Sequence, residues 1–491
     1  MSSTLHAPYG VAYLGRDAAT WGSEIGDVPI DPDICPSPDL CPQYMDRSIG
    51  PDDKIHLVIA SFRDRLCPRT LYNLFSKAEN PYRMFVRVLQ QIESNSALDD
   101  DGDCWEGMCK QYNGATFDCN AFKRNIEIVS VPASTAKGPT DARAKLSALI
   151  EHDYIHASDG KHRLSPVAVT DYCMQTDSHM DFSHNYDTQL IAMFHRAEND
   201  RAVLSTYVDP MENNDKDPKQ VPHLCMIRFT NTWRNWGTKY LQNALKPKLT
   251  NLVWGAGLSF QKCHAELNVP YDPFLDGVFD GEETSRGMRF FTHGYDVYTP
   301  DKVLVTHDYH GHQSNPNVHS WGRNNVMREV DQDLLKGVDM SFMDHIESVR
   351  DSVAPKSTER LNILFGLTSD VDPKTIEAIV GSRYGLGNRR TLDQAYEFAG
   401  FDRVEHTMVG HNRCGNLKWV PFEASNLEDW GVSETLNRKL WNEEHLVLKR
   451  VNDQSGNPLM IGSFGVCLLP LVYLIRRKGW CKQSKDEKSL Q

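Results

Sequence analysis

The feature that most constrains the fold is a series of segments near the start of the chain. It consists of an apolar run, a helical stretch and two further apolar runs. Residues 55–60, 82–88 and 126–131 predict buried strands, and residues 70–78 predict a helix between the first two. Strand, helix, strand is the opening of a parallel α/β sheet, whose strands are apolar because helices cover both faces. We therefore predict an α/β fold built on a central sheet.

The length of 491 residues allows one large catalytic domain with additions, or two to three domains. A hydrophobic content of 40% indicates an ordered globular protein, and the net charge of -13 argues against general nucleic-acid binding, which needs a basic face. We divide the chain into a polar N-terminal leader, a catalytic domain, its helical C-terminal part, an extension, an apolar segment and a basic polar tail, at residues 1–53, 54–328, 329–405, 406–457, 458–475 and 476–491.

The triplet at 177–179 is the strongest chemical signal in the chain. Asp177 and His179 follow a strand-like run at 167–175, and in an extended segment residues i and i+2 point to the same side. An oxygen and a nitrogen ligand together suit Mn²⁺, Zn²⁺ or Fe²⁺. By itself the triplet also fits a surface loop with two solvated polar residues. Its place after a strand favours a metal site, because open α/β sheets bind ligands outside the carboxyl ends of their strands.

Other candidate residues lie at the ends of neighbouring predicted elements. A short apolar run at 303–305 leads into His307, our preferred third metal ligand, with His310 in reserve. A helix beginning at 138–141 places Arg143 in its first turns, where a phosphate or nucleotide could bind. A plain surface arginine is the alternative.

Two further stretches indicate substrate contacts. Trp254, Gly255 and Gly257 combine an aromatic ring with small residues, which let a flat ligand approach the backbone closely. Glu282 and Glu283 are adjacent carboxylates that could hold sugar hydroxyls or handle a proton. A glycine turn and a solvated acidic face are the alternatives for these two stretches.

Several ordered stretches of this chain resemble glycosyltransferase family 60. They are the runs at 58–64, 142–143, 175–182, 281–283, 293–298 and 384–392, so that the likeness covers roughly residues 54 to 403. Members of that family include cytoplasmic enzymes that place N-acetylglucosamine on a hydroxyproline of a ubiquitin-ligase adaptor. The resemblance implies a GT-A fold, in which a D-x-H motif ties Mn²⁺ or Mg²⁺ to the diphosphate of a UDP-sugar. Similar D-x-H chemistry occurs in the polypeptide N-acetylgalactosaminyltransferases, which are retaining enzymes.

The resemblance also implies residue roles and a reaction. Transfer of N-acetylglucosamine from UDP-GlcNAc to a hydroxyl of a glycan or of a protein hydroxyproline, Ser or Thr is the expected reaction. The metal ligands are expected to be Asp177, His179 and His307. Nucleotide contacts are expected from Ser61, Arg63, Asp64, Arg143 and Asp177, substrate contacts from Trp254, Gly255, Gly257 and Tyr295, and catalytic roles from Glu282, Glu283 and Asp296.

Two other functions fit parts of the pattern. Two histidines and a carboxylate also form the facial triad of iron-dependent oxygenases, although such a site normally lies in a double-sheet β roll. A noncatalytic carbohydrate-binding protein on the same fold is the second alternative. A comparison of UDP binding with 2-oxoglutarate binding discriminates the glycosyltransferase from the oxygenase. Metal-dependent hydrolysis of a UDP-sugar would exclude the noncatalytic protein.

Cysteine usage and the C-terminal region bear on the compartment. Twelve cysteines without a C-x-x-C pair fit scattered reduced thiols or a few disulfides; residues 1–33 lack the apolar core of a secretory signal, which favours reduced thiols and a cytoplasmic location. Residues 458–475 are uncharged and, as a helix of ~27 Å, marginally long enough for a bilayer. We predict a transmembrane anchor there, with a buried apolar element as the alternative.

Two further regions are predicted from residue pattern alone. The acidic, cysteine-bearing stretch at 94–120 is expected to be a solvated insertion and not a calcium loop, because Ala97 and Met108 occupy the positions where that loop needs acids. Residues 331–353 and 357–367 are expected to pack as a helical C-terminal appendage.

Overall fold

The structure of the protein, a computed structural model, describes a defined part of the chain, and the statements below concern that part. The described residues are 11–13, 53–93, 102–213, 221–229, 233–241, 244–309, 354–368, 371–410, 413–414, 417–421 and 447–449.

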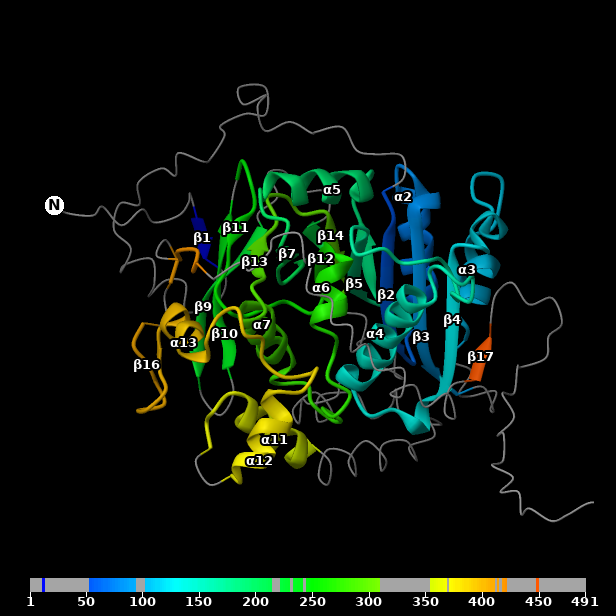
Figure 1. The fold of residues 1–491 in the computed structure, drawn as a ribbon. Coiled ribbons are helices and arrows are strands. Elements are labelled where there is room, and N and C mark those ends of the chain that lie inside the picture. Colours follow the sequence, from blue (N-terminus) through cyan, green and yellow to red (C-terminus); the bar gives the residue numbers. More distant parts are fainter. Residues whose placement is uncertain are drawn as a thin grey trace, which may run out of the picture.

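A mixed nine-stranded sheet forms the centre of the molecule (Figure 1), with the order β11-β13-β7-β12-β5-β2-β3-β4-β17. Strands β4, β3, β2 and β5 run parallel to one another. Strand β12 is antiparallel to both β5 and β7, and β13 is parallel to β7. The bounds are β2 Ile55–Phe62, β3 Met84–Ile92, β4 Ile126–Pro132, β5 Tyr172–Asp177, β7 Ala202–Ser205, β11 Lys248–Leu249, β12 Leu258–Lys262, β13 Asp296–Thr299 and β17 Val447–Lys449.

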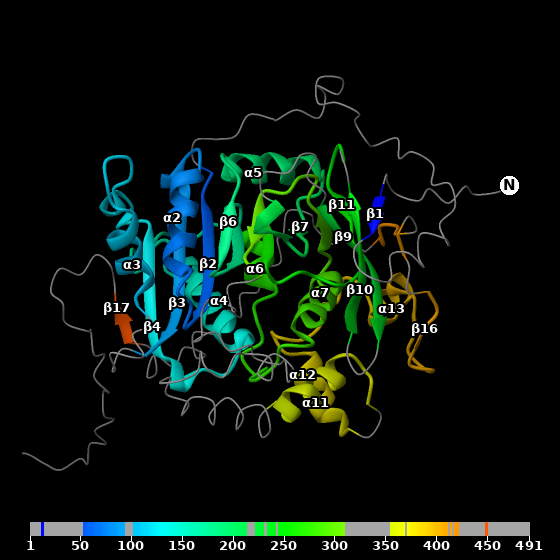
Figure 2. The same ribbon diagram turned by 180° about the vertical axis from the view of Figure 1, so that it is seen from behind.

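Alternate residues of the parallel strands bury on opposite faces of this sheet. Leu57 and Ile59 of β2 join one core cluster with Leu71 of α2 (Cys67–Lys77). Val58 between them joins another cluster with Leu146 of α4 (Pro139–Ile155). Helix α4 covers the face seen in Figure 1 and α2 the face seen in Figure 2. The strands and the helix predicted at 55–131 are thus present, and the predicted α/β class is confirmed.

A small second sheet, β6-β14-β8, stands at the carboxyl end of β5. Strand β6 (Met180–Phe182) begins three residues after β5 ends and pairs antiparallel with β14 (Val305–His307), which is parallel to β8 (Asp209–Pro210). The register sets His307 opposite Met180. The pairing therefore brings the end of β14 beside the 177–179 turn, although more than 120 residues separate them in sequence.

Three helices from the C-terminal half of the described chain pack together. Helix α7 (Glu282–Thr292) shares a core cluster with α11 (Ala354–Leu364) and α13 (Leu392–Ala399). The run predicted to be helical at 357–367 largely falls in α11, whereas 331–353 lies outside the described residues. The other elements are β1 Val11–Tyr13, η3 Pro81–Arg83, α3 Cys104–Tyr112, η4 Cys119–Phe122, η5 Ala133–Thr135, α5 Tyr186–Arg196, η6 Met211–Asn213, β9 Val221–Phe229, β10 Trp233–Leu241, α6 Cys263–Asn268, α12 Pro373–Val380, β15 Phe401–Asp402 and β16 Thr407–Met408.

The prediction of reduced thiols is wrong. Eight of the cysteines form disulfides that pair Cys67 with Cys104, Cys109 with Cys119, Cys173 with Cys263, and Cys225 with Cys414. One of these bonds, Cys109–Cys119, lies within the region predicted to be a solvated insertion, and a second ties Cys104 of that region to Cys67 of α2. There, α3 buries Cys104 and Met108 against the main core, so residues 102–120 are part of the folded body.

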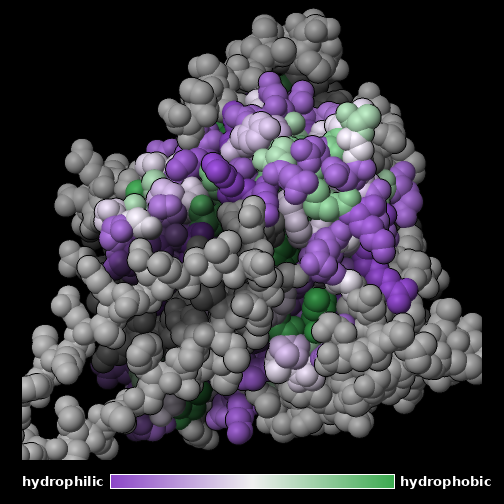
Figure 3. Space-filling view, turned by 90° about the vertical axis from the view of Figure 1, so that its right-hand side faces the viewer, coloured by the Kyte–Doolittle hydropathy of each residue, from purple (hydrophilic) through white to green (hydrophobic). Residues whose placement is uncertain are grey.

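The predicted transmembrane helix is also corrected. None of the helices in the described ranges combines the length and the apolar character needed to cross a bilayer. The segment for which it was predicted, 458–475, lies outside those ranges. On the face of the molecule shown in Figure 3, most of the coloured surface is hydrophilic, and hydrophobic residues form only small groups.

Candidate active site

Three potential metal ligands converge at the carboxyl end of β5. Asp177 is the last residue of β5, His179 lies in the turn before β6, and His307 ends β14. One ligand atom from each lies within 4.8 Å of the others. The two imidazole Nε2 atoms are 2.9 Å apart, and His307 Nε2 is 3.7 Å from Asp177 Oδ2. The structure thus brings together the three residues predicted to hold the metal, and the reserve ligand, His310, lies outside the described residues.

The chemistry of this group fits a divalent cation. Two nitrogens that each bind one Zn²⁺ at about 2.1 Å lie roughly 3.4 Å apart at its tetrahedral angle, somewhat more than the 2.9 Å between the two Nε2 atoms here. A single proton would satisfy only those two nitrogens, whereas a cation also satisfies the carboxylate. Gly257 lies beside this group, and a Cβ at that position would lie 3.4 Å from Asp177 Oδ2 and 3.3 Å from Val208 Cγ2.

The surroundings favour the metal-binding protonation states of Asp177 and His307, but not that of His179. Burial would raise the pKa of Asp177, but Arg143 and the two imidazoles outweigh it and lower the pKa. Burial and the neighbouring His179 lower the pKa of His307 to about 4, so that this imidazole is neutral at neutral pH. Burial acts in the same direction on His179, yet the charge and hydrogen bond of Asp64 prevail and raise its pKa. Metal binding at His179 therefore competes with a proton.

Arg143 bridges two carboxylates in the interior of the site. It lies in the first turns of α4, as predicted, and its side chain is 9% exposed. Its Nη2 donates to Asp177 Oδ1 at 2.6 Å, and its Nη1 donates to Glu282 Oε1. Tyr271 adds a second hydrogen bond to Glu282, at 2.9 Å. Arg143 therefore orients a metal ligand and is not the plain surface residue that was the alternative; its predicted contact with the nucleotide stays a prediction.

The two adjacent glutamates of α7 have different surroundings. Glu282 is buried and paired with Arg143. Glu283 is only partly buried and accepts hydrogen bonds from the Tyr207 hydroxyl and, at 3.2 Å, from the backbone N–H of Ala256. Burial raises the pKa of Glu283 to about 7 in spite of these hydrogen bonds. Glu283 is therefore the carboxyl group better suited to proton exchange, and Glu282 is better suited to anchoring Arg143.

The end of β2 and the turn after it contact the site through Asp64. Ser61 and Arg63 are buried, and Arg63 adopts a left-handed backbone conformation with φ of 50°. The backbone N–H of Arg63 donates to Gln91 O at 3.0 Å, which fixes the turn to β3. Asp64 accepts a hydrogen bond from His179 Nδ1 at 2.7 Å. The predicted nucleotide contacts of Ser61, Arg63 and Asp64 stay predictions, and the link between Asp64 and His179 was not foreseen.

Several residues predicted to touch substrate are buried in the interior instead. The Trp254 side chain is fully buried, and its Nε1 donates to Ser259 Oγ at 3.1 Å. Gly255 is dictated by packing, because a Cβ there would lie 2.4 Å from Thr206 O. The Tyr295 hydroxyl lies 2.9 Å from His264 Nδ1, in the core behind β13. These contacts explain the residue types without a ligand, so the substrate contacts stay predictions that burial does not favour.

Asp296 is likewise engaged within the protein. Its carboxylate pairs with Arg390 at 2.8 Å and accepts hydrogen bonds from Trp419 Nε1 at 2.9 Å and Asn199 Nδ2 at 3.0 Å. It is only 5% exposed. A buried carboxylate with that many donors is typical of a structural ion pair. The catalytic role predicted for Asp296 therefore has no support in its contacts.

Tyr309 is a neighbour of the metal ligands that the sequence analysis missed. Its ring lies against that of His307, with ring centroids 4.1 Å apart, and its hydroxyl donates to Val208 O at 2.8 Å. The side chain remains 42% exposed. The spacing carried the signal, because a residue two positions beyond a ligand in an extended segment points to the same side.

Comparison with known proteins places this arrangement in a family. The model of the family described as glycosyltransferase (GlcNAc) matches residues 54–405, most of the chain. The chain belongs to this family. Membership leaves the iron-dependent oxygenase without support, and the GT-A type of the α/β fold stays a prediction. No curated protein matches the chain.

Solved structures show weaker likeness. A crystal structure of GalNAc-T7 with UDP, GalNAc and Mn²⁺ is 12% identical, with a TM-score of 0.40, over 72% of this chain and 59% of that one. S. aureus TarS 1-349 in complex with UDP-GlcNAc is 12% identical, with a TM-score of 0.32, over 70% of this chain and 73% of that one. The chain thus spans less than two thirds of the GalNAc-T7 chain.

Proposed function

We infer that this protein is a metal-dependent glycosyltransferase that moves N-acetylglucosamine from UDP-GlcNAc to a hydroxyl acceptor. The observation that carries the proposal is the group formed by Asp177, His179 and His307 at the carboxyl end of β5, within a chain of the GlcNAc glycosyltransferase family. That edge of an open α/β sheet is where such folds bind nucleotides.

The roles of the residues follow from their contacts. Asp177, His179 and His307 would hold the cation, and an imidazole-rich set favours Mn²⁺ over Mg²⁺. The bound cation would supply positive charge where the leaving diphosphate develops negative charge. Arg143 keeps Asp177 in place, because its guanidinium is fixed at the other end by Glu282. Glu283, whose pKa is raised to about 7 by burial, can donate or accept a hydrogen bond with a sugar or acceptor hydroxyl.

The finer assignments rest on the resemblance to glycosyltransferase family 60. They are retention of the anomeric configuration and an acceptor hydroxyl of a protein hydroxyproline, Ser or Thr. The name of the matched family supports N-acetylglucosamine as the sugar. Direct competition among UDP-GlcNAc, UDP-GalNAc and UDP-glucose as donors would decide the sugar.

The test is release of UDP from UDP-GlcNAc in the presence and absence of Mn²⁺. Asp177→Asn keeps the shape of the side chain and removes its charge, and should lower Mn²⁺-dependent hydrolysis to near background. Asp181→Asn is the matched control, because Asp181 is a nearby carboxylate that pairs with Lys77 and is not a member of the metal group. Hydrolysis that needs no metal, or equal activity in Asp177→Asn and Asp181→Asn, would refute the proposal.

A further inference from the structure

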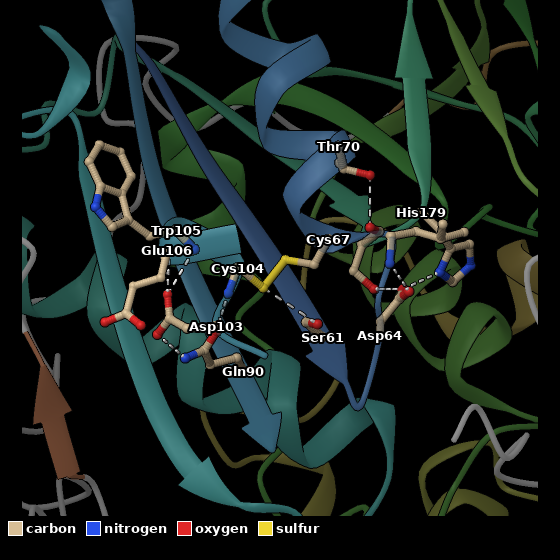
Figure 4. The surroundings of a disulfide bond; sticks show 12 residues. Ser61, Asp64, Cys67, Thr70, Gln90, Asp103, Cys104, Trp105, Glu106 and His179 are labelled. Carbon is tan, nitrogen blue, oxygen red and sulfur yellow. Dashed lines mark hydrogen bonds and ion pairs between the residues drawn. A yellow bond between two sulfur atoms is a disulfide. The ribbon is translucent and has the colours of Figure 1, made fainter. Parts of the chain in front are cut away.

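The beginning of α2 lies against the turn that carries His179, and two of its residues hold that turn (Figure 4). Asp64 lies three residues before the first residue of the helix, and Thr70 lies in its first turns. The two side chains are 6% and 0% exposed. Both reach the 178–180 segment across more than 100 residues of sequence, so the fold, and not local chain geometry, makes the contact.

Asp64 acts on the imidazole of His179. Its Oδ2 accepts hydrogen bonds from His179 Nδ1 at 2.7 Å and from Ser178 Oγ at 2.5 Å. Its Oδ1 accepts one from the backbone N–H of Leu66 at 2.8 Å. An ionised carboxylate can only accept, so the ring must carry its proton on Nδ1. Nε2 of His179 then carries a lone pair and lies 2.9 Å from His307 Nε2.

Thr70 acts on the backbone around the same histidine. Its hydroxyl donates to Ser178 O at 2.7 Å and accepts from the Met180 N–H at 2.9 Å. These bonds grip the chain on both sides of His179. The Cys67–Cys104 disulfide ties the segment between Asp64 and Thr70 to α3, which fixes the origin of both contacts.

We propose that Asp64 is a positioning residue for the metal ligand His179, with Thr70 fixing the backbone that carries it, and that Asp64 does not bind the nucleotide. Both carboxylate oxygens of Asp64 are already used within the protein, which leaves little capacity for a ligand. A carboxylate behind a metal-bound imidazole fixes the tautomer and raises the basicity of the ligand. The inference rests on the proposed function, because it requires that His179 bind the cation.

The test is Mn²⁺ affinity, measured by titration in the absence of donor at about pH 8, above the range where free imidazole protonates. Asp64→Asn should weaken Mn²⁺ binding by about ten-fold to a hundred-fold, the usual effect of losing such a partner. Thr70→Val should weaken it less, and Thr70→Ser, which restores the hydroxyl, should return it to the wild-type value.

The control is Asp103→Asn. Asp103 is also a carboxylate that accepts backbone hydrogen bonds at a helix start, here from Trp105 and Glu106 of α3, and it accepts a further one from Gln90. The Asp103→Asn variant should change the melting temperature about as much as Asp64→Asn does, and it should leave Mn²⁺ affinity unchanged. That contrast separates positioning of the ligand from general stabilisation.

The outcomes distinguish the inference from the function on which it rests. Wild-type protein that binds no Mn²⁺ would overturn the proposed metal site itself. Wild-type affinity in Asp64→Asn, in a protein that does bind Mn²⁺, would overturn only the positioning role. If Asp64→Asn fails to fold, Ser178→Ala decides, because it removes one hydrogen bond from Asp64 and should weaken Mn²⁺ binding several-fold; an unchanged affinity refutes the inference.

Discussion

Replacing Arg143 by methionine tests the charge balance at the centre of the site. Methionine is similar in length and fills the space, so the substitution removes mainly the charge and the hydrogen bonds. Those bonds join Arg143 to Asp177 and to Glu282, whose side chains are 22% and 4% exposed. Without the guanidinium, Glu282 loses its charged partner, and Asp177 keeps only the neighbouring imidazoles.

The expected cost follows from these contacts. A hydrogen bond to a charged group contributes about 1.5 to 3 kcal/mol, and breaking a buried ion pair by removing one partner costs about 3 to 5 kcal/mol. We expect Arg143→Met to lower the free energy of unfolding by about 3 to 5 kcal/mol. Adding Glu282→Gln removes the uncompensated charge and should restore about half of that loss.

The assay is denaturant unfolding of the metal-free protein in EDTA, so that altered metal binding cannot contribute. Lys145→Ala is the matched control on the same helix, because Lys145 is 30% exposed and pairs with Asp141 at the i,i+4 spacing. A pair of that kind contributes about 0.5 kcal/mol. A loss below about 1 kcal/mol in Arg143→Met, or a double variant no more stable than the single one, would refute the reasoning.

Three other perturbations have definite expected outcomes. Burial, aided by Arg87, lowers the pKa of His56 from 6.5 to about 4, so the unfolded state binds more protons than the folded state in that pH range. The stability contributed by neutral His56 should therefore be lost as the pH falls from about 6.5 to 4, and His56→Gln should flatten the pH dependence of the unfolding midpoint. The Cβ of Gly255→Ala would lie 2.4 Å from Thr206 O, so this variant should be destabilised by about 1 to 3 kcal/mol in thermal unfolding. Gly257→Ala should instead keep the melting temperature and weaken Mn²⁺ binding. Alkylation of denatured but unreduced protein, followed by mass spectrometry, should leave unmodified the eight cysteines that form disulfides in the described part of the chain. Cys67→Ser with Cys104→Ser should cost about 4 kcal/mol for a loop of 37 residues.

The metal group was predictable because each ligand lies at the end of a strand-like run. Asp177 and His179 are two residues apart, and His307 closes the apolar run at 303–305. Side chains alternate in an extended chain, which places Asp177 and His179 on the same side. Open α/β sheets bind ligands outside the carboxyl ends of their strands, which places the metal group at that edge. The order of the central sheet was not predictable beyond its opening, since nothing in the run at 258–262 signals that β12 lies reversed between β5 and β7.

The partners of the site residues could not be predicted, because they depend on contacts between distant segments. Arg143 was expected to face the nucleotide, and only the fold shows that Glu282, 139 residues away, holds its other end. In the same way, the sequence next to Asp64 carries no sign of His179, 115 residues later. Trp254 and Tyr295 were predicted to contact substrate, but both side chains are buried in the core. Aromatic residues near a motif are more often part of the core than of a binding site.

The cysteine pairs bear on where the protein folds. Cysteines 173 and 263 are 90 residues apart, and cysteines 225 and 414 are 189 apart, yet each pair meets in the interior. Disulfides persist in oxidising compartments and are rare in the cytosol. The predicted cytoplasmic location rested on the polar character of residues 1–33, which is independent of this pairing, and it stays a prediction. Thiol trapping in freshly isolated protein tests it: free thiols at these positions would favour the cytosol, and oxidised pairs would favour an oxidising compartment.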